Sequence, residues 1–116
     1  MLRSHPISIL SGIFIAALIA SGEVALAQND ATSANYLMPG CRAFIGPASR
    51  QDRCTGIVEG LVFAGKDVGV CAPRASTLEQ SIRIVLQYIE SRPAKRYDNF
   101  IALALEALKA RWPCKN

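Results

Sequence analysis

Residues 77–93, TLEQSIRIVLQYIESRP, carry the pattern that decides the fold class. Thr77 is followed three residues later by Gln80, which is typical of a capping box at the start of a helix, and Ser76 with Glu79 offers the same signal one residue earlier. Apolar side chains then recur every three or four residues, which places them on one face of an α-helix. The proline that closes the stretch ends the helix. The apolar positions are Leu78, Ile82, Val85, Leu86 and Ile89.

The same periodicity appears on the N-terminal side of this stretch. Residues 54–62 carry apolar side chains at helical spacing, and Ser49 with Asp52 three residues later predicts the N-cap of this helix. Gly56 and Gly60 lie one turn apart within it. Glycine costs about 1 kcal/mol inside a helix, so we expect a neighbouring helix to approach closely there.

Two further helices complete the expected domain. One covers residues 34–45, where Pro39-Gly40 predicts either a kink or a fresh start at the proline. The other is stopped by Pro113, and residues 68–70 are too short and glycine-rich for a strand. The sequence therefore predicts an all-α fold, a small compact domain of four antiparallel helices. The expected buried face of the last helix consists of Tyr97, Ile101, Ala104, Leu105, Leu108 and Trp112.

The N-terminus has the features of an export signal. Arg3 precedes an apolar run over residues 7–20, and Ala25-Leu26-Ala27 supplies the small residues of a cleavage site. An uncleaved anchor is the alternative, but a membrane-spanning helix needs about 20 apolar residues. We expect a periplasmic protein with no membrane association after cleavage. Its expected organisation is a signal peptide at 1–27, a flexible N-terminus at 28–33 and a helical domain at 34–116.

All four cysteines lie after the predicted cleavage site: Cys41, Cys54, Cys71 and Cys114. An even number of cysteines in a small exported domain predicts two disulfides. Zinc is the alternative, but the chain has no C-x-x-C pair, and its single histidine, His5, lies in the signal segment. We therefore expect disulfides, and neither a metal nor another cofactor.

The order of the helices suggests which cysteines pair. Cys41 near the end of the first helix and Cys54 near the start of the second lie at the same end of the domain. Cys71, in the next loop, and Cys114, after the last helix, lie at the opposite end. A helix of 10–15 residues spans roughly 15–22 Å, whereas bridged Cα atoms lie within about 7 Å. We predict the pairs Cys41–Cys54 and Cys71–Cys114.

Composition argues against several classes of function. The net charge is +4, and the basic residues are spread along the chain, whereas a nucleic-acid interface concentrates them beside aromatic residues. The predicted mature part has no histidine, the commonest general base. Its glutamates fall on predicted helix surfaces near arginine or lysine, where solvated ion pairs are the better interpretation. We therefore expect no enzyme, but a protein that binds another protein.

One surface stands out as a candidate for that partner. Ile84 and Tyr88 lie one turn apart, roughly 100–140° from the apolar stripe of their helix, and Leu103 points away from the predicted face of the last helix. The alternatives are a wide core face and an exposed patch for a partner. Charged loop residues are either plain solvated charge or part of the same surface; they are Arg92, Lys95, Arg96, Lys66 and Asp67.

Several short motifs in a fixed order resemble one known family. The chain is similar to the Tai-type immunity proteins, also called the Rap immunity proteins, over nearly all of residues 28–116. The matching features are Cys41 in the first helix, Cys54-Thr-Gly-Ile-Val-Glu-Gly60, Cys71-Ala-Pro73, Thr77-x-x-Gln80, Val85-Leu-Gln-Tyr-Ile89 with Arg92-Pro93, and an Ala-Leu pair before Trp112-Pro113-Cys114.

This resemblance implies an all-helical periplasmic protein, often a homodimer. Members of the family bind a cell-wall amidase, a papain-like cysteine peptidase delivered by a type VI secretion system, and occlude its active-site cleft. The cysteines and helix-packing glycines carry over as scaffold, while the contacts with the partner differ from pair to pair. The Pro39-Gly40 break departs from an uninterrupted first helix. Two alternatives outside the family are a periplasmic holdase of the acid-stress type and a carrier of a small apolar ligand.

Overall fold

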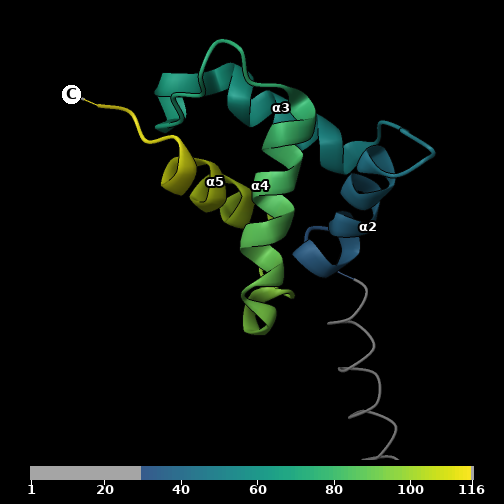
Figure 1. Ribbon diagram of the computed structural model, residues 1–116. Helices are drawn as coiled ribbons and strands as arrows, with labels where there is room; N and C mark the ends of the chain where they lie inside the picture. The colour runs from purple at the N-terminus through teal and green to yellow at the C-terminus, as the bar shows by residue number, and fades with distance from the viewer. Residues whose placement is uncertain (1–29, 116) are drawn as a thin grey trace, which may run out of the picture.

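The computed structural model describes residues 30–115, which form an all-α domain (Figure 1). Within these residues there is no strand, only two isolated bridges, Ser33–Asn99 and Val70–Pro113. The predicted fold class is confirmed, and the predicted signal peptide lies outside the described residues. The helices are α2 (Ala34–Ile45), α3 (Arg53–Ala64), α4 (Leu78–Glu90) and α5 (Phe100–Arg111), with the 3-10 turns η2 (Gly65–Val68) and η3 (Pro93–Lys95).

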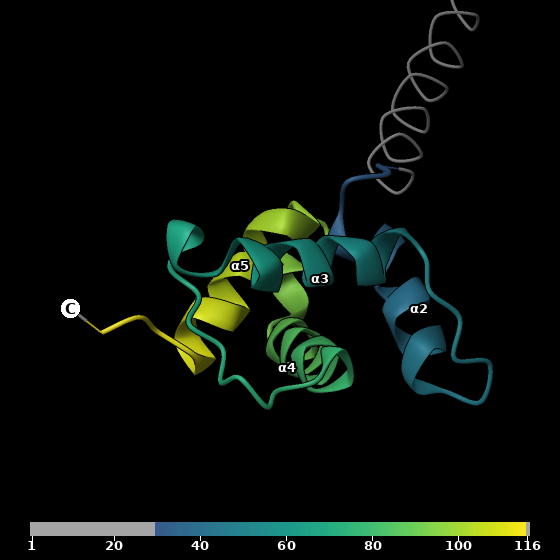
Figure 2. The same cartoon turned by 90° about the horizontal axis from the view of Figure 1, so that it is seen from above.

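Helix α4 is the centre of the domain. It contacts each of the other three α-helices, with α2 and α5 on either side of it (Figure 1). Figure 2 looks nearly along α4 and shows α3 running across it. The sequence predicts four antiparallel helices. In the structure α3 crosses α4 instead, so this part of the prediction is wrong. The buried side chains of α4 belong to the core, and its other side chains are exposed or partly exposed.

Capping side chains set where α3 and α4 begin. Thr77 and Gln80 form the predicted capping box of α4: the Gln80 amide donates to Thr77 Oγ1 (3.1 Å) and the Thr77 amide to Gln80 Oε1 (2.8 Å). The prediction of Ser49 as the N-cap of α3 is wrong. Asp52 occupies that position and accepts from the amide of Cys54 at 2.9 Å. A cap reaches only two or three residues ahead, and Ser49, with φ 46°, lies in the loop before it.

Helix α2 continues through Pro39 as one helix and does not restart there. Gly40 is the glycine at which helices approach: a Cβ on it would overlap the carboxylate of Asp52, the N-cap of α3. The close approach predicted at Gly56 and Gly60 is wrong, since a Cβ on either would meet nothing within 4 Å. Both lie on the exposed side of α3.

The buried face of α5 is rotated from the predicted one. Phe100 is 0% exposed and Leu103 2%, while Ile101 is 49% and Tyr97 44% exposed. Tyr97 precedes the helix, whose N-cap is Asn99. Apolar residues occupy most positions around α5, so its sequence alone does not select a face, and the large Phe100 side chain fills the core. Ala104 and Leu108, the part of the prediction that holds, are buried.

Both predicted disulfides are confirmed. Cys41–Cys54 joins α2 to the first turn of α3 with 5.4 Å between the Cα atoms. Cys71–Cys114 joins the segment after η2 to the segment after α5, with a Cα separation of 5.0 Å. Beside it the Cys71 amide donates to the Trp112 carbonyl (2.8 Å). Each end of the domain is thus closed by a covalent link.

The segment before α2 is attached to the start of α5. Ser33 is buried, and the Phe100 amide donates to the carbonyl of Thr32 at 2.8 Å. The Thr32 hydroxyl and amide both donate to the Asp30 carboxylate and hold the pKa of that carboxyl below its ordinary value. The sequence predicts a flexible N-terminus at residues 28–33. Asp30, Thr32 and Ser33, which make these contacts, belong to that segment.

Candidate partner-binding surface

A groove of about 400 Å³ runs between α4 and α5. We call it the α4–α5 groove. The α5 side of the groove has small side chains, which leave room for it. One of them, Ala107, is only 1% exposed and forms its floor. The α4 side contributes larger groups with both apolar and polar parts. The residues that line the groove are Ile84, Gln87, Tyr88, Ser91, Ala107, Ala110 and Arg111.

Tyr88 and Arg92 form a fixed aromatic–cation pair at this groove. The Arg92 guanidinium lies 3.6 Å from the centroid of the Tyr88 ring, and its Nη1 donates to the Tyr88 carbonyl (2.9 Å) and to Ser91 Oγ (2.8 Å). The Tyr88 hydroxyl donates to Glu106 Oε2 of α5 at 3.2 Å. Tyrosine and arginine dominate the energetics of many protein interfaces, and a side chain already held in place loses less entropy on binding.

Ile84 and Tyr88 combine the two alternatives left open by the sequence. Both are partly buried and pack against the core, yet both also line the α4–α5 groove. Leu103, expected to point away from the core, is 2% exposed and belongs to it. Two of the three apolar residues singled out from the sequence therefore reach the surface.

The charged loop residues fall into two separate places. Arg92, Lys95 and Arg96 surround η3, directly before α5, and all are exposed. Arg96 Nη2 donates to the Tyr97 hydroxyl at 3.1 Å.

Lys66 and Asp67 belong to η2. Gly69, just after η2, lies against the Lys109 side chain near the other end of α5. A helix of this length spans about 18 Å, so the charged residues around η2 and η3 do not form one surface. Of these charged residues, Arg92 joins the α4–α5 groove through its contacts with Tyr88 and Ser91.

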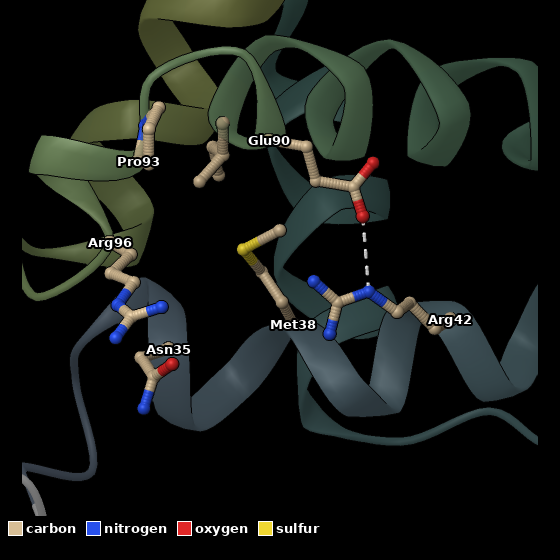
Figure 3. A pocket seen from close by; sticks show the side chains of 7 residues that line it. Asn35, Met38, Arg42, Glu90, Pro93 and Arg96 are labelled. Atoms are coloured by element: carbon tan, nitrogen blue, oxygen red, sulfur yellow. Dashed lines mark hydrogen bonds and ion pairs between the residues drawn. The ribbon is translucent and has the colours of Figure 1, made fainter.

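A second depression separates α2 from α4 (Figure 3). Arg42 Nε of α2 and Glu90 Oε2 of α4 form an ion pair across it at 3.1 Å. Sequence analysis singled out neither residue for a partner surface. They lie 48 positions apart, so only the packing of α2 on α4 brings them together, and no local pattern announces the pair.

Phe63 is a further surface residue that the sequence reasoning missed. It is 92% exposed on α3, one position outside the apolar stripe that ends at Val62. Its position beside the stripe, and not on it, is the feature of the sequence that could have indicated an exposed side chain. Phe63 lines neither the α4–α5 groove nor the depression beside Arg42.

The described residues offer little for other chemistry. All four cysteines are in disulfides. Within residues 30–115 no three His, Cys, Asp or Glu side chains gather as a metal site. No helix in the same part of the chain has the length and apolar character to cross a membrane.

One comparison with known proteins identifies a family. The family model described as Rap1a immunity proteins matches residues 33–114. This match begins at the N-cap of α2 and ends at Cys114, so it includes all four helices and both disulfides. No curated protein and no solved structure matches the chain.

Proposed function

The chain belongs to the Rap1a immunity proteins, and from this we propose that it protects a bacterial cell by binding a toxic effector protein. The match over residues 33–114 is the single observation that carries the proposal. In finer terms, the effector is a peptidoglycan amidase delivered by a type VI secretion system. The bound protein occludes the active-site cleft of the amidase.

The periplasm is the proposed place of action. Disulfides persist in oxidising compartments and are rare in the cytosol; this chain has two of them. The charged, apolar and small-residue regions of a signal peptide precede the domain at residues 1–27. A cell-wall amidase reaches its substrate in that same compartment, so inhibitor and effector would meet there.

The proposed contact surface is the α4–α5 groove together with Arg92. The groove has an apolar floor, and the Tyr88–Arg92 pair stands at its edge with both side chains already held by hydrogen bonds. The Cys71–Cys114 disulfide links the segment before α4 to the segment after α5, the two helices that form the groove. A rigid inhibitor retains more of its contact energy as affinity, because little conformational entropy is lost on binding.

Protection of cells is the direct test. A candidate peptidoglycan amidase is exported to the periplasm of a host bacterium with and without this protein; any hydrolase gene found beside this one is the first to try. We expect lysis in its absence, survival in its presence, and a purified complex in which peptidoglycan cleavage is lost. Unrelieved lysis together with no complex on affinity capture would contradict the proposal.

Two matched variants test the surface. Tyr88→Asp places a charge at the α4–α5 groove and removes the ring beneath Arg92, and we expect it to weaken the complex by at least about tenfold, 1.4 kcal/mol. Ile101→Asp places the same charge on another side of α5, at a residue that is 49% exposed. It should leave affinity unchanged. Equal loss in both variants, or in neither, would move the contact elsewhere on the domain.

A further inference from the structure

The depression between α2 and α4 is longer than one pocket. A pocket of about 200 Å³ lies on one side of the Arg42–Glu90 ion pair, and one of about 500 Å³ lies on the other. Both residues line both pockets, so the two pockets adjoin and the ion pair lies between them. Figure 3 shows the first pocket with the ion pair at its border. We treat the two pockets as one furrow. We call it the α2–α4 furrow.

Positive charge dominates the lining of this furrow. Arg96 stands at one end beside Asn35, Arg42 in the middle and Arg83 at the other end, while Glu90 is the one carboxylate among the lining residues. Arg83 also has a carboxylate partner on its own helix, Glu79, at 3.5 Å.

Arg96 has no carboxylate partner within 4.0 Å among residues 30–115. Its guanidinium donates to the neutral hydroxyl of Tyr97 at 3.1 Å and lies 5.1 Å from the centroid of the Tyr97 ring. Arg42 and Arg83 each have one carboxylate partner, Glu90 and Glu79. Arg96 is therefore the guanidinium of the furrow that is left, among residues 30–115, without a negative partner.

The base of the furrow is apolar and firmly packed. Met38 is 3% exposed, Ile89 1% and Leu86 4%, and each lines one of the two pockets. A ligand segment lying here would contact apolar atoms below and guanidinium groups at the sides. This combination suits a peptide more than a small free anion, because a peptide has both apolar and charged parts.

We propose that the α2–α4 furrow binds an acidic protein segment, whose carboxylates pair with Arg96, Arg42 and Arg83. Under the proposed function, on which this part rests, the segment belongs to the effector. Guanidinium groups present a planar fork that matches a carboxylate in a bidentate manner. The occupant follows from charge complementarity with the lining residues.

The Arg42–Glu90 pair does not block such a ligand. Its side chains are 50% and 51% exposed, and pairs this exposed contribute little to stability because water screens them. An incoming carboxylate can therefore replace Glu90 as the partner of Arg42. Glu90 competes with the ligand, so its removal should strengthen binding.

A short N-acetylated, amidated oligoglutamate peptide tests the furrow without any effector. NMR titration of the mature protein should shift the Nε–Hε signals of Arg42, Arg83 and Arg96, and a matched oligoglutamine peptide should not. Binding should weaken as salt rises from about 0.01 to 0.15 M, where the screening length falls from about 30 to 8 Å. Absence of shifts, or equal shifts at Arg74 and Arg111, would overturn the proposal.

Three variants sharpen this test. Glu90→Gln should bind the peptide several-fold more tightly, whereas Arg96→Glu should bind it roughly tenfold more weakly. Arg74→Glu, in the exposed loop before α4, carries the same charge change away from the furrow and should match the wild type. Weaker binding by Glu90→Gln would show that the ion pair holds the furrow in shape, and would contradict the competition described above.

The effector experiment separates this inference from the proposed function. If the wild type protects cells and Arg96→Glu protects equally with unchanged affinity, the function stands and the furrow is not part of the contact. If the wild type binds no effector, the function fails, and the peptide titration alone decides whether the furrow recognises acidic segments. Tighter binding of phosphatidylglycerol vesicles than of the peptide, lost in Arg96→Glu, would assign the furrow to a lipid surface and overturn the proposal.

Discussion

Gly40 lies where α2 passes the beginning of α3, and its missing side chain is occupied by the Asp52 carboxylate. That carboxylate caps α3 by accepting from the Cys54 amide. Cys41, the next residue along α2, is bonded to Cys54, so the two helices have little freedom to separate. A Cβ atom at position 40 would therefore displace the Asp52 carboxylate from its capping position at the start of α3.

Gly40→Ala should lower the free energy of unfolding by about 1 kcal/mol, because a lost N-cap outweighs the gain in helix propensity. Gly56→Ala is the matched control: nothing lies within 4 Å of its new Cβ, so it should gain about 0.5–1 kcal/mol. Urea unfolding with intact disulfides measures both. When Asp52 is already replaced by alanine, Gly40→Ala should lower the free energy of unfolding by less. An equal decrease in both backgrounds would show that the effect of Gly40→Ala does not act through the Asp52 cap.

Phe100 and Ile101 are neighbours with opposite environments. Phe100 is 0% and Ile101 49% exposed, whereas the sequence predicts that Ile101 lies on the buried face. Phe100→Ala should cost about 3–5 kcal/mol, the usual loss for a buried phenylalanine, whereas Ile101→Ala should change stability by less than about 0.5 kcal/mol. Thermal unfolding of the two variants compares them directly. Comparable losses would mean that α5 buries the face first predicted for it.

At the scale of a helix, the start of α3 gives a clear test. Asp52→Ala should lower the unfolding free energy by about 1–2 kcal/mol, because Asp52 accepts hydrogen bonds from the amides of Cys54 and Thr55. Ser49→Ala should change it by less than about 0.5 kcal/mol, since Ser49 lies outside the helix. Chemical denaturation distinguishes the two, and a large effect at Ser49 would restore the capping site suggested by the sequence.

The features that could be predicted well from the sequence are those set by residues close together along the chain. The Thr77–Gln80 capping box spans one turn, so its side chains meet whenever the helix forms. The predicted range of the first helix, residues 34–45, also matches α2. The face of α5 could not be predicted, because a helix with apolar residues on most sides is oriented by the groups that pack against it.

The same distinction between local contacts and contacts made by packing applies to the candidate surface. Tyr88 and Arg92 lie four positions apart, so their contact at 3.6 Å is a local one, although Arg92 lies just beyond the end of α4. The partners Arg42 and Glu90 come from α2 and α4, and their contact exists only after the domain has folded. Lys66 and Asp67 resembled Arg92 and Lys95 as charged loop residues, yet α5 separates the two loops. Loop composition does not reveal such distances.

At the scale of the whole molecule, the two disulfides close loops of different length. Cys41–Cys54 spans 13 residues and Cys71–Cys114 spans 43. In the chain-entropy model these links contribute about 3 and 4 kcal/mol to stability. Small domains are stable by only about 5–15 kcal/mol in total. The described helices therefore depend on oxidation, which fits a protein that works outside the cytosol.

Burial should make the two disulfides react in order. Cys41 and Cys54 are each 0% exposed, whereas Cys71 is exposed and Cys114 partly so. A thiolate must reach a sulfur atom to reduce a disulfide, so access controls the rate. Under native conditions dithiothreitol should therefore reduce Cys71–Cys114 first, and Cys41–Cys54 only as fast as the domain opens.

Alkylation at successive times, followed by peptide mass spectrometry, measures this order. Urea should abolish the difference, because unfolding exposes all four sulfur atoms equally. If Cys41 and Cys54 are alkylated as early as Cys71 in the absence of urea, the end of the domain where α2 meets α3 opens more readily than its burial indicates. The α2–α4 furrow would then also lack the rigidity that binding an acidic segment requires.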